Sequence, residues 1–314
     1  MIIRKANNND KDKVLEFCKN TFSWGDYIHT VWDSWLNDPF GLLLTLETSD
    51  INKKLQPVAI SHIMRCPNNF LWIEGIRVNQ NYRKQGLASF LLKHMIDLGI
   101  KWGNVEANAI VSYNNVPSQK MFEKHGFSKL FDFVYYNINL KRELGETSLS
   151  NSIKEEIRLK VPNINDIYSI SAFLKRSQIY KYCKRRYFNS WKFYILDNSY
   201  HFLSFLINNN KLLLFTNELN QIKALSLINI IEQKDNFYNK YTVQICYLDC
   251  IDYFDYSNVI DMLFYHYLKS SIYSYIQFYL PYSIEINDSI IKEKIKHFEK
   301  FFLYSKNLNN FGNR

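Results

Sequence analysis

Apolar residues recur with two different spacings along the first 140 positions of the chain. A spacing of two indicates strands, and a spacing of three or four indicates helices. Asn9-Asp10 suits the start of the first helix, and Asp38-Pro39 ends the second. The predicted strands are Ile2–Arg4, Leu42–Leu46, Pro57–Met64, Phe70–Val78, Val105–Val111 and Phe131–Leu140, and the predicted helices are Val14–Cys18, Tyr27–Leu36, Leu87–Ile100 and Pro117–Lys124.

A polar segment follows this half of the chain. Lys141–Glu156 is the least apolar stretch, and regular patterning resumes at Ile157. The 314 residues are enough for two hydrophobic cores. We therefore expect a first domain over residues 1–142, a linker over 143–156 and a second domain over 157–314.

The second half resembles the first in three places, which occur in the same order. Matches in a conserved order indicate an internal duplication. Two of the matches have an offset of 156 residues, and the third has an offset of 165 after a short insertion. The matched pairs are Ile3–Phe17 with Leu159–Phe173, Ser34-Trp35 with Ser190-Trp191, and Ala59–Ile63 with Ala224–Ile228.

The composition is that of a folded globular protein, with 47% apolar and 22% charged residues. The net charge of +9 favours anionic partners without establishing nucleic-acid binding. The five cysteines form no CxxC pair and no zinc spacing, so we expect free thiols in a cytoplasmic protein and no metal. Charged residues interrupt the apolar stretch Val259–Ile284, which predicts a buried helix and strand and no membrane span.

The segment with the clearest chemistry runs from Trp72 to Ala88. It reads as a strand, a basic loop with one glycine, and a long helix. A glycine lets the backbone approach a ligand closely, and the first N–H groups of a helix are unpaired donors. With Arg83 and Lys84 beside them, these groups predict a cradle for a diphosphate.

This segment resembles the pyrophosphate loop of the GNAT superfamily of N-acetyltransferases, Gln/Arg-x-x-Gly-x-Gly/Ala, with Arg83, Gly86 and Ala88 in the motif positions. A second signature of the family follows about thirty residues later, at Asn115, Ser118, Phe122 and Gly126-Phe127. The resemblance covers residues 1–140. It implies an α/β (α+β) fold with a mixed, mostly antiparallel central sheet flanked by helices, here duplicated.

The resemblance also implies direct transfer of an acetyl group from acetyl-CoA to an amine. The loop, with Lys84, Gln85 and Leu87 between its motif residues, would hold the pyrophosphate. The backbone of Ile76, Arg77 and Val78 would bond the pantetheine arm, and Asn115 and Ser118 would lie near the thioester. Many members have a tyrosine at the Phe122 position, where it can protonate the leaving thiolate. Water, Ser118 or Tyr113 would have to replace it, or the thiolate leaves unassisted.

An alkyl ammonium must lose a proton before it attacks a thioester, so the site needs a base. Glu74 is our first candidate, because strand alternation places it on one face with Ile76 and Val78. The alternative is a glutamate paired with a nearby lysine or arginine. His62 and His29 are weaker candidates, and a satisfied core histidine is the simpler interpretation of His62.

Aromatic residues lie where the family places its acceptor-binding helices. Trp24, Asp26 and Tyr27 are candidates for binding a cationic amine. The alternative is a buried helix face formed by Tyr27, Val31 and Trp35. The acceptor itself stays open: a small molecule or amino acid is favoured over protein amines, and an amino-acid α-amine is the narrowest hypothesis. Polyamines, aminoglycosides and a longer acyl group also remain.

The second half lacks the cradle. Its corresponding stretch, Leu248–Val259, has no glycine and no basic residue and carries three aspartates, so we expect a degenerate, inactive copy. Its basic and aromatic cluster, Tyr180–Phe188, includes Lys184, Arg185 and Arg186. The alternative function for the whole chain is therefore a non-catalytic module that binds RNA or a protein through this cluster. A solvated helix face backed by core aromatics is the simpler interpretation.

Overall fold

The structure is a computed structural model, which describes residues 1–22, 25–49, 54–140, 157–234, 239–251, 255–282, 284 and 298–309. The chain forms two compact units. Unit 1 contains Met1–Val111, Asn115–Lys129 and Leu303–Arg314, and unit 2 contains Ser112–Asn114 and Leu130–Phe302. No helix among the described residues is long and apolar enough to cross a membrane.

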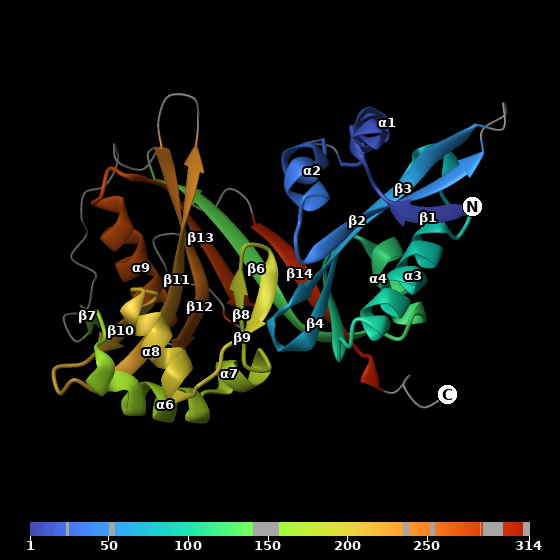
Figure 1. Cartoon of the computed structure of the whole chain (residues 1–314). Coiled ribbons are helices and arrows are strands. Elements are labelled where there is room, and N and C mark those ends of the chain that lie inside the picture. Colours follow the sequence, from blue (N-terminus) through green and yellow to red (C-terminus); the bar gives the residue numbers. More distant parts are fainter. Residues whose placement is uncertain are drawn as a thin grey trace. The chain divides into compact units, whose positions relative to one another are not determined.

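Unit 1 is a mixed sheet with helices on both faces (Figure 1). β1 to β4 are antiparallel, and β4 pairs with β5 in parallel. Helices α1 (Lys11–Cys18) and α2 (Ile28–Leu36) lie on one face, and α3 (Leu87–Lys101) and α4 (Val116–Lys124) lie on the other. The strand order is β1 (Ile2–Lys5), β2 (Gly41–Ser49), β3 (Leu55–Cys66), β4 (Phe70–Val78), β5 (Glu106–Ser112) and then the end of β14 (Phe298–Asn307).

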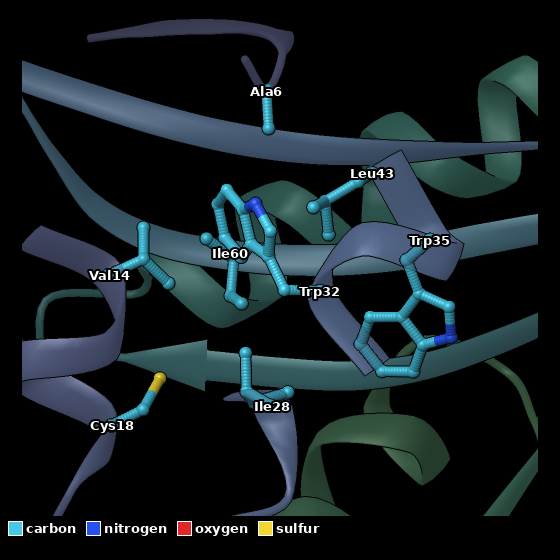
Figure 2. Packing of buried hydrophobic residues seen from close by; sticks show 8 residues of the cluster. All are labelled: Ala6, Val14, Cys18, Ile28, Trp32, Trp35, Leu43 and Ile60. Carbon is cyan, nitrogen blue, oxygen red and sulfur yellow. The ribbon is translucent and has the colours of Figure 1, made fainter. Parts of the chain in front are cut away.

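The face under α1 and α2 holds a hydrophobic cluster (Figure 2). Ile28, Trp32 and Trp35, spaced by four and three residues, are the buried face of α2. The predicted stripe of Tyr27, Val31 and Trp35 is therefore right for Trp35, whereas Tyr27 and Val31 are only partly buried. The helix is rotated relative to the prediction, because Trp32, which is 0% exposed, is buried in the cluster where the prediction placed the smaller Val31.

Unit 2 is also a mixed sheet with helices. β12 pairs with β13 in parallel, and the pairs β7–β10, β10–β11, β11–β12 and β13–β6 are antiparallel. β8 (Arg186–Asn189) and β9 (Lys192–Ile195) form a separate hairpin. The helices are α6 (Ile167–Arg176), α7 (Gln178–Tyr182), α8 (Tyr200–Asn208) and α9 (Asp255–Leu268). After the first residues of β14, the strand order is β6 (Ser128–Asn139), β13 (Tyr273–Pro281), β12 (Asn239–Cys250), β11 (Ile222–Lys234), β10 (Leu212–Thr216) and β7 (Arg158–Lys160).

The strands of the two units contain matching rows of paired residues. The first strand of each unit is followed by a 3-10 turn with a capping box, made by Asn7 with Asp10 and by Asn163 with Asp166. In unit 1 one row runs Ile3, Leu46, Ala59, Val78, and the next runs Arg4, Thr45, Ile60, Arg77. In unit 2 the corresponding rows run Leu159, Phe215, Ala224, Cys250 and Lys160, Leu214, Leu225, Asp249.

Two parts of the sequence interpretation change here. The match of Ser34-Trp35 to Ser190-Trp191 is wrong as a structural equivalence, because Trp35 lies in α2 and Trp191 lies in the β8–β9 turn at a φ of 63°. The units also differ from the expected boundary, since Leu130–Asn139 belong to unit 2 and Leu303–Asn307 to unit 1. The position of a strand near the end of the sequence does not reveal which unit it joins. The expected linker, 143–156, lies outside the described residues.

Candidate active site

A β-bulge in β4 determines which side chains face α2. Ile60 pairs with Arg77 and His62 pairs with Glu74, so two residues of β4, Gly75 and Ile76, lie opposite Ser61 alone. Gly75 has a φ of +67°, and a Cβ there would lie 2.5 Å from the ring of Trp35. Glycine is therefore required on both backbone and steric grounds.

The bulge overturns the expected alternation of Glu74, Ile76 and Val78 on one face. Val78 pairs with Ala59, and Glu74 pairs with His62. Ala59 and His62 lie three positions apart on β3, which is regular between them, so their side chains face opposite sides of the sheet. Glu74 and Val78 therefore face opposite sides of the sheet. Arg77 lies on the same side as Glu74, and this is the side of α1 and α2. Simple alternation fails because the extra residue reverses the direction of every side chain that follows it.

Glu74 and the buried imidazole of His62 form the centre of the site. Nδ1 of His62 lies 3.0 Å from Oε1 of Glu74, and the ring stacks on Trp35 with 4.8 Å between centroids. On the other side, Nε2 lies 3.1 Å from Oδ2 of Asp38, in a direction outside hydrogen-bond geometry. A neutral imidazole has one N–H, so this geometry favours the tautomer that donates from Nδ1 to Glu74.

The three groups differ in their access to solvent. The side chain of His62 is 1% exposed, whereas Glu74 and Asp38 keep 15% and 14% of their side-chain surface. Gly41 closes the site behind His62, because a Cβ there would lie 2.8 Å from Nε2 and 2.6 Å from Asp38 Oδ2. The arrangement holds one carboxylate oxygen of Glu74 in place and leaves part of its surface accessible.

The loop from Arg83 to Gly86 is exposed and leads into α3. Lys84 has a φ of 61° and Gly86 a φ of +80°, so the chain turns sharply before the helix begins at Leu87. Apart from its two neighbours in the chain, no atom of the described residues lies within 4 Å of the position that a Cβ of Gly86 would occupy. The first N–H groups of α3 therefore adjoin open space, as an anion cradle requires. Leu87, the first residue of α3, is buried, and Ala88 is half-buried.

The edge of β4 next to this loop is only partly paired. Its pairing with β5 joins Phe70–Trp72 to Glu106–Asn108. The backbone of Ile76, Arg77 and Val78 lies beyond that paired segment. The role of these backbone groups in adding a ligand as an extra strand stays a prediction.

The second signature forms the start of α4 and the core beneath it. The side chain of Asn115 caps the helix by accepting the N–H of Ser118 at 3.2 Å. Phe122 is 4% exposed and packs edge-on against Phe127, with 5.0 Å between ring centroids. Phe122 is thus a core residue that has no hydroxyl to donate.

Asp26 has a different partner from the expected cationic amine. Its carboxylate accepts two hydrogen bonds from Arg77, at 2.7 and 3.2 Å, and its side chain is 3% exposed. The guanidinium also lies over the rings of Phe22 and Tyr27. Burial lowers the pKa of Arg77, but the bonds to Asp26 outweigh it, so the guanidinium keeps its charge. The carboxylate is neutralised by Arg77, and Arg77 can offer a ligand only its backbone.

The remaining candidates lie as follows. Burial raises the pKa of the Tyr27 phenol, and its ring meets Trp35 edge-on. Nδ1 of His29 donates to the carbonyl of Asp26 at 2.8 Å, outside the group formed by Glu74, His62 and Asp38. Trp24 falls outside the described residues.

The aromatic residues of the cluster Tyr180–Phe188 mostly belong to the core of unit 2. Tyr180 is 5% exposed and donates its hydroxyl to the carbonyl of Leu196. Phe188 is 1% exposed and stacks on Tyr279. Lys184 and Arg185 are exposed, but Arg186 is buried. The simpler interpretation is right for the buried rings of Tyr180 and Phe188, but the helix face is wrong, because α7 ends at Tyr182 and Lys184 and Arg185 follow it in a turn with φ of 52° and 56°.

The sequence interpretation missed Asp38 and the link between His62 and Glu74. A signal was present: antiparallel strands Pro57–Met64 and Phe70–Val78, joined by a short turn, bring residues of this spacing opposite each other. The bulge shifts the register of these two strands. Gly75 is the one residue in this part of the sequence that indicates it, so the pairing of His62 with Glu74 was not predicted.

Three comparisons relate this chain to known proteins. The model of the family described as "Acetyltransferase (GNAT) family" matches residues 13–127. The GCN5-related N-acetyltransferase from Sphaerobacter thermophilus shares 11% identity with a TM-score of 0.61, over 98% of this chain and 95% of that one. A glucosamine N-acetyltransferase region in a fungal multi-domain β-N-acetylglucosaminidase shares 12% identity with a TM-score of 0.57, over 97% of this chain and 38% of that one. No curated protein matches the sequence.

These likenesses to solved structures show the fold and confirm the predicted fold class, a mixed sheet with flanking helices. Residues 13–127 contain α1 to α4, β2 to β5, the Arg83–Ala88 loop and Glu74.

Proposed function

We propose that this chain, whose residues 13–127 are a GNAT acetyltransferase domain, transfers an acetyl group from acetyl-CoA directly to an amine, with Glu74 as the general base. The observation that carries this proposal is the pairing of an open loop at the start of α3 with a partly exposed carboxylate held by His62. The family supports acetyl transfer in general. We propose a small molecule or an amino acid as the acceptor, because the carboxylates of the site, Glu74 and Asp38, expose only 15% and 14% of their side-chain surface.

The loop has the features that a diphosphate needs. Gly86 leaves the space open, Arg83 and Lys84 add positive charge, and the N–H groups of Leu87 and Ala88 begin a helix. The backbone of Ile76 to Val78 would bind the pantetheine arm along the edge of β4. Acetyl-CoA supplies the activated acetyl thioester; the chain supplies binding, orientation and the base.

Glu74 would take the proton that the amine must lose. A free alkyl ammonium has a pKa of about 10, so the neutral amine is scarce at pH 7 without a base. His62 bonds one oxygen of the carboxylate and Trp35 stacks on His62, so the carboxylate is oriented before the acceptor arrives. His62 is thus a positioning residue in this proposal.

No side chain of the second signature can protonate the leaving thiolate from the position of Phe122. We propose water or the hydroxyl of Ser118 as the donor. A thiolate is a weak base compared with an alkoxide, so assistance is less important here than at the amine.

We further propose that unit 2 is a degenerate copy of unit 1. The matching rows of paired residues and the two capping boxes support it. Cys250 occupies the position of Val78, and its N–H already bonds the hydroxyl of Tyr256, which is 2% exposed. In unit 2 the hydroxyl of Tyr256 thus accepts the backbone N–H that, at the equivalent position of unit 1, would be offered to a cofactor.

The RNA- or protein-binding alternative loses its main support, because Tyr180 and Phe188 are buried in unit 2. The direct experiment is an acetylation assay that follows the free thiol of coenzyme A with a panel of amines. The panel contains amino acids, polyamines, aminoglycosides and peptides with a free N-terminus or lysine. Turnover with any amine, lost in Glu74→Gln, supports the proposal; absence of turnover with every amine, despite acetyl-CoA binding, contradicts it.

A further inference from the structure

Asp249 is a buried carboxylate that has no cationic partner among the described residues. It is 1% exposed, and its hydrogen bonds come from two hydroxyl groups, those of Tyr247 at 2.6 Å and of Ser177. Buried carboxylates are normally paired with a cation, because a charge removed from water is costly without one. The position therefore leaves a negative charge uncompensated inside unit 2.

The equivalent position in unit 1 is compensated. Arg77 pairs with Ile60 as Asp249 pairs with Leu225, in matching rows of the two sheets. In unit 1 the charge at this position meets Asp26, from the loop before α2. In unit 2 the group that meets Asp249 from the start of α7 is the neutral hydroxyl of the N-cap residue Ser177. Asp249 occupies the same position in its row as Arg77, but its charge is negative instead of positive. No described residue supplies the opposite charge.

A pocket opens beside Asp249. Its volume is about 250 Å³, and its lining comes from the end of α6, the start of α7, the end of β12 and the start of α9. A cavity of about 150 Å³ is enough to hold benzene. Phe173, Ile179 and Ile251 give it apolar walls, and the exposed Arg176 lies at its lining. The pocket is too small for a molecule the size of coenzyme A.

We propose that this pocket binds a small organic ammonium ligand of about ten non-hydrogen atoms, with its ammonium group on Asp249. The cation supplies the counter-charge that no described residue gives to Asp249, and the carbon chain packs against the apolar walls. The site is separate from the proposed acetyl-transfer site, and it does not depend on catalysis by unit 1. A ligand that carries a carboxylate, such as an amino acid, could also meet Arg176.

The site can be tested by changing the pH, because the charge of Asp249 depends on it. Burial raises the pKa of Asp249 to about 6, so the carboxylate is ionised at pH 8 and mostly protonated at pH 5. The groups that face it are the hydroxyl of Ser177, the phenols of Tyr247 and Tyr256 and the thiol of Cys183, with Arg176 in the same pocket. The phenols and the thiol have raised pKa values and stay neutral over this range. Asp249 is therefore the group here that changes charge between pH 5 and pH 8.

The test is calorimetric titration of the full chain with three probes at constant ionic strength: n-butylamine hydrochloride, leucine and potassium chloride. We expect n-butylamine to bind at one site with a Kd of about 1 mM or tighter at pH 8. Binding should weaken about tenfold at pH 5, in proportion to the ionised fraction of Asp249. Asp249→Asn should abolish it. The matched control is Glu218→Gln, which removes the same charge from an exposed position of unit 2 and should bind like the unaltered protein.

The other outcomes decide the proposal as follows. Leucine binding that Arg176→Gln weakens, and n-butylamine binding that it does not weaken, would identify a zwitterionic ligand within the proposed class. Binding of potassium alone, or binding of n-butylamine that is equal at pH 5 and pH 8, would overturn the proposal. No binding of either ammonium probe by the folded protein would overturn it too. The pH comparison uses the unaltered protein, so the test stands even if Asp249→Asn fails to fold.

Discussion

Nδ1 of His62 lies 3.0 Å from Oε1 of Glu74, across the ladder between β3 and β4. The bulge at Gly75 and Ile76 follows this contact and puts Arg77 on the same side of the sheet as Glu74, and Gly75 leaves room for the Trp35 ring that stacks on His62. A carboxylate that would otherwise rotate freely is thereby held in one orientation. The proposed reaction depends on this pair, and the first two predictions address it.

Substitution of Glu74 by Gln should lower kcat about 10²- to 10⁴-fold at neutral pH, the range typical of general-base catalysis. The deficit should shrink as the pH approaches about 10, where the amine is neutral in solution. Affinity for acetyl-CoA should stay unchanged. Steady-state kinetics from pH 6 to 10 check this, with the exposed α1 variant Glu16→Gln as control. A pH-independent deficit would show that Glu74 is not the base.

Substitution of His62 by Gln should remove the donor to Glu74 and lower kcat about tenfold or more, since a hydrogen bond to a charged group contributes about 1.5–3 kcal/mol. His62→Asn, whose amide nitrogen can occupy the Nδ1 position, should retain more activity. KM for acetyl-CoA should not change in either variant. If the two variants lose activity equally and only in proportion to their lost stability, His62 is merely a core residue.

The ion pair of Arg77 and Asp26 should stabilise unit 1 rather than bind the acceptor. Asp26→Asn leaves the guanidinium buried without its partner and should cost about 3–5 kcal/mol in the free energy of unfolding. Arg77→Met combined with Asp26→Leu should recover much of this loss, because no charge then remains buried. Denaturant unfolding of the single and double variants measures the coupling. A stable Asp26→Asn protein with impaired acceptor binding would contradict this assignment.

Asp249 should make stability depend on pH. Burial raises its pKa from 3.8 to about 6, so the folded protein binds this proton more tightly than the unfolded chain. Its contribution to stability is therefore full below about pH 4 and is lost as the pH rises through about 6. A shift of about two units corresponds to about 3 kcal/mol. The stability of the unaltered protein relative to Asp249→Asn should fall by this amount between about pH 4 and pH 7; parallel stability curves would contradict it.

The sequence predicted the elements of unit 1 and the loop before α3, because apolar spacing, capping residues and the position of Gly86 are all local signals. Burial of Trp35 followed from the same spacing. The facing of Glu74 could not be predicted, since one extra residue in a ladder reverses alternation and its place depends on how Gly75 packs against Trp35.

Partners brought together by the sheet were harder to see than local structure. Asp26 looked available for an amine, but Arg77, 51 positions later, neutralises it. The chain order also concealed that Leu303–Asn307 join unit 1. In both cases the sequence shows which side chains and strands are present. Which residues they contact depends on the pairing of segments that are far apart in the chain.

The most direct measurement is a calorimetric titration with acetyl-CoA of the unaltered chain, Gly86→Glu and Gly103→Glu. Both glycines have a positive φ, +80° and +77°, and neither has an atom of the described residues, chain neighbours apart, within 4 Å of its Cβ position, so the two variants carry equal backbone strain and added charge. Only Gly86 lies in the proposed cradle. We predict one site per chain, lost in Gly86→Glu and kept in Gly103→Glu. Absence of binding, two sites per chain, or equal behaviour of the two variants would contradict the account.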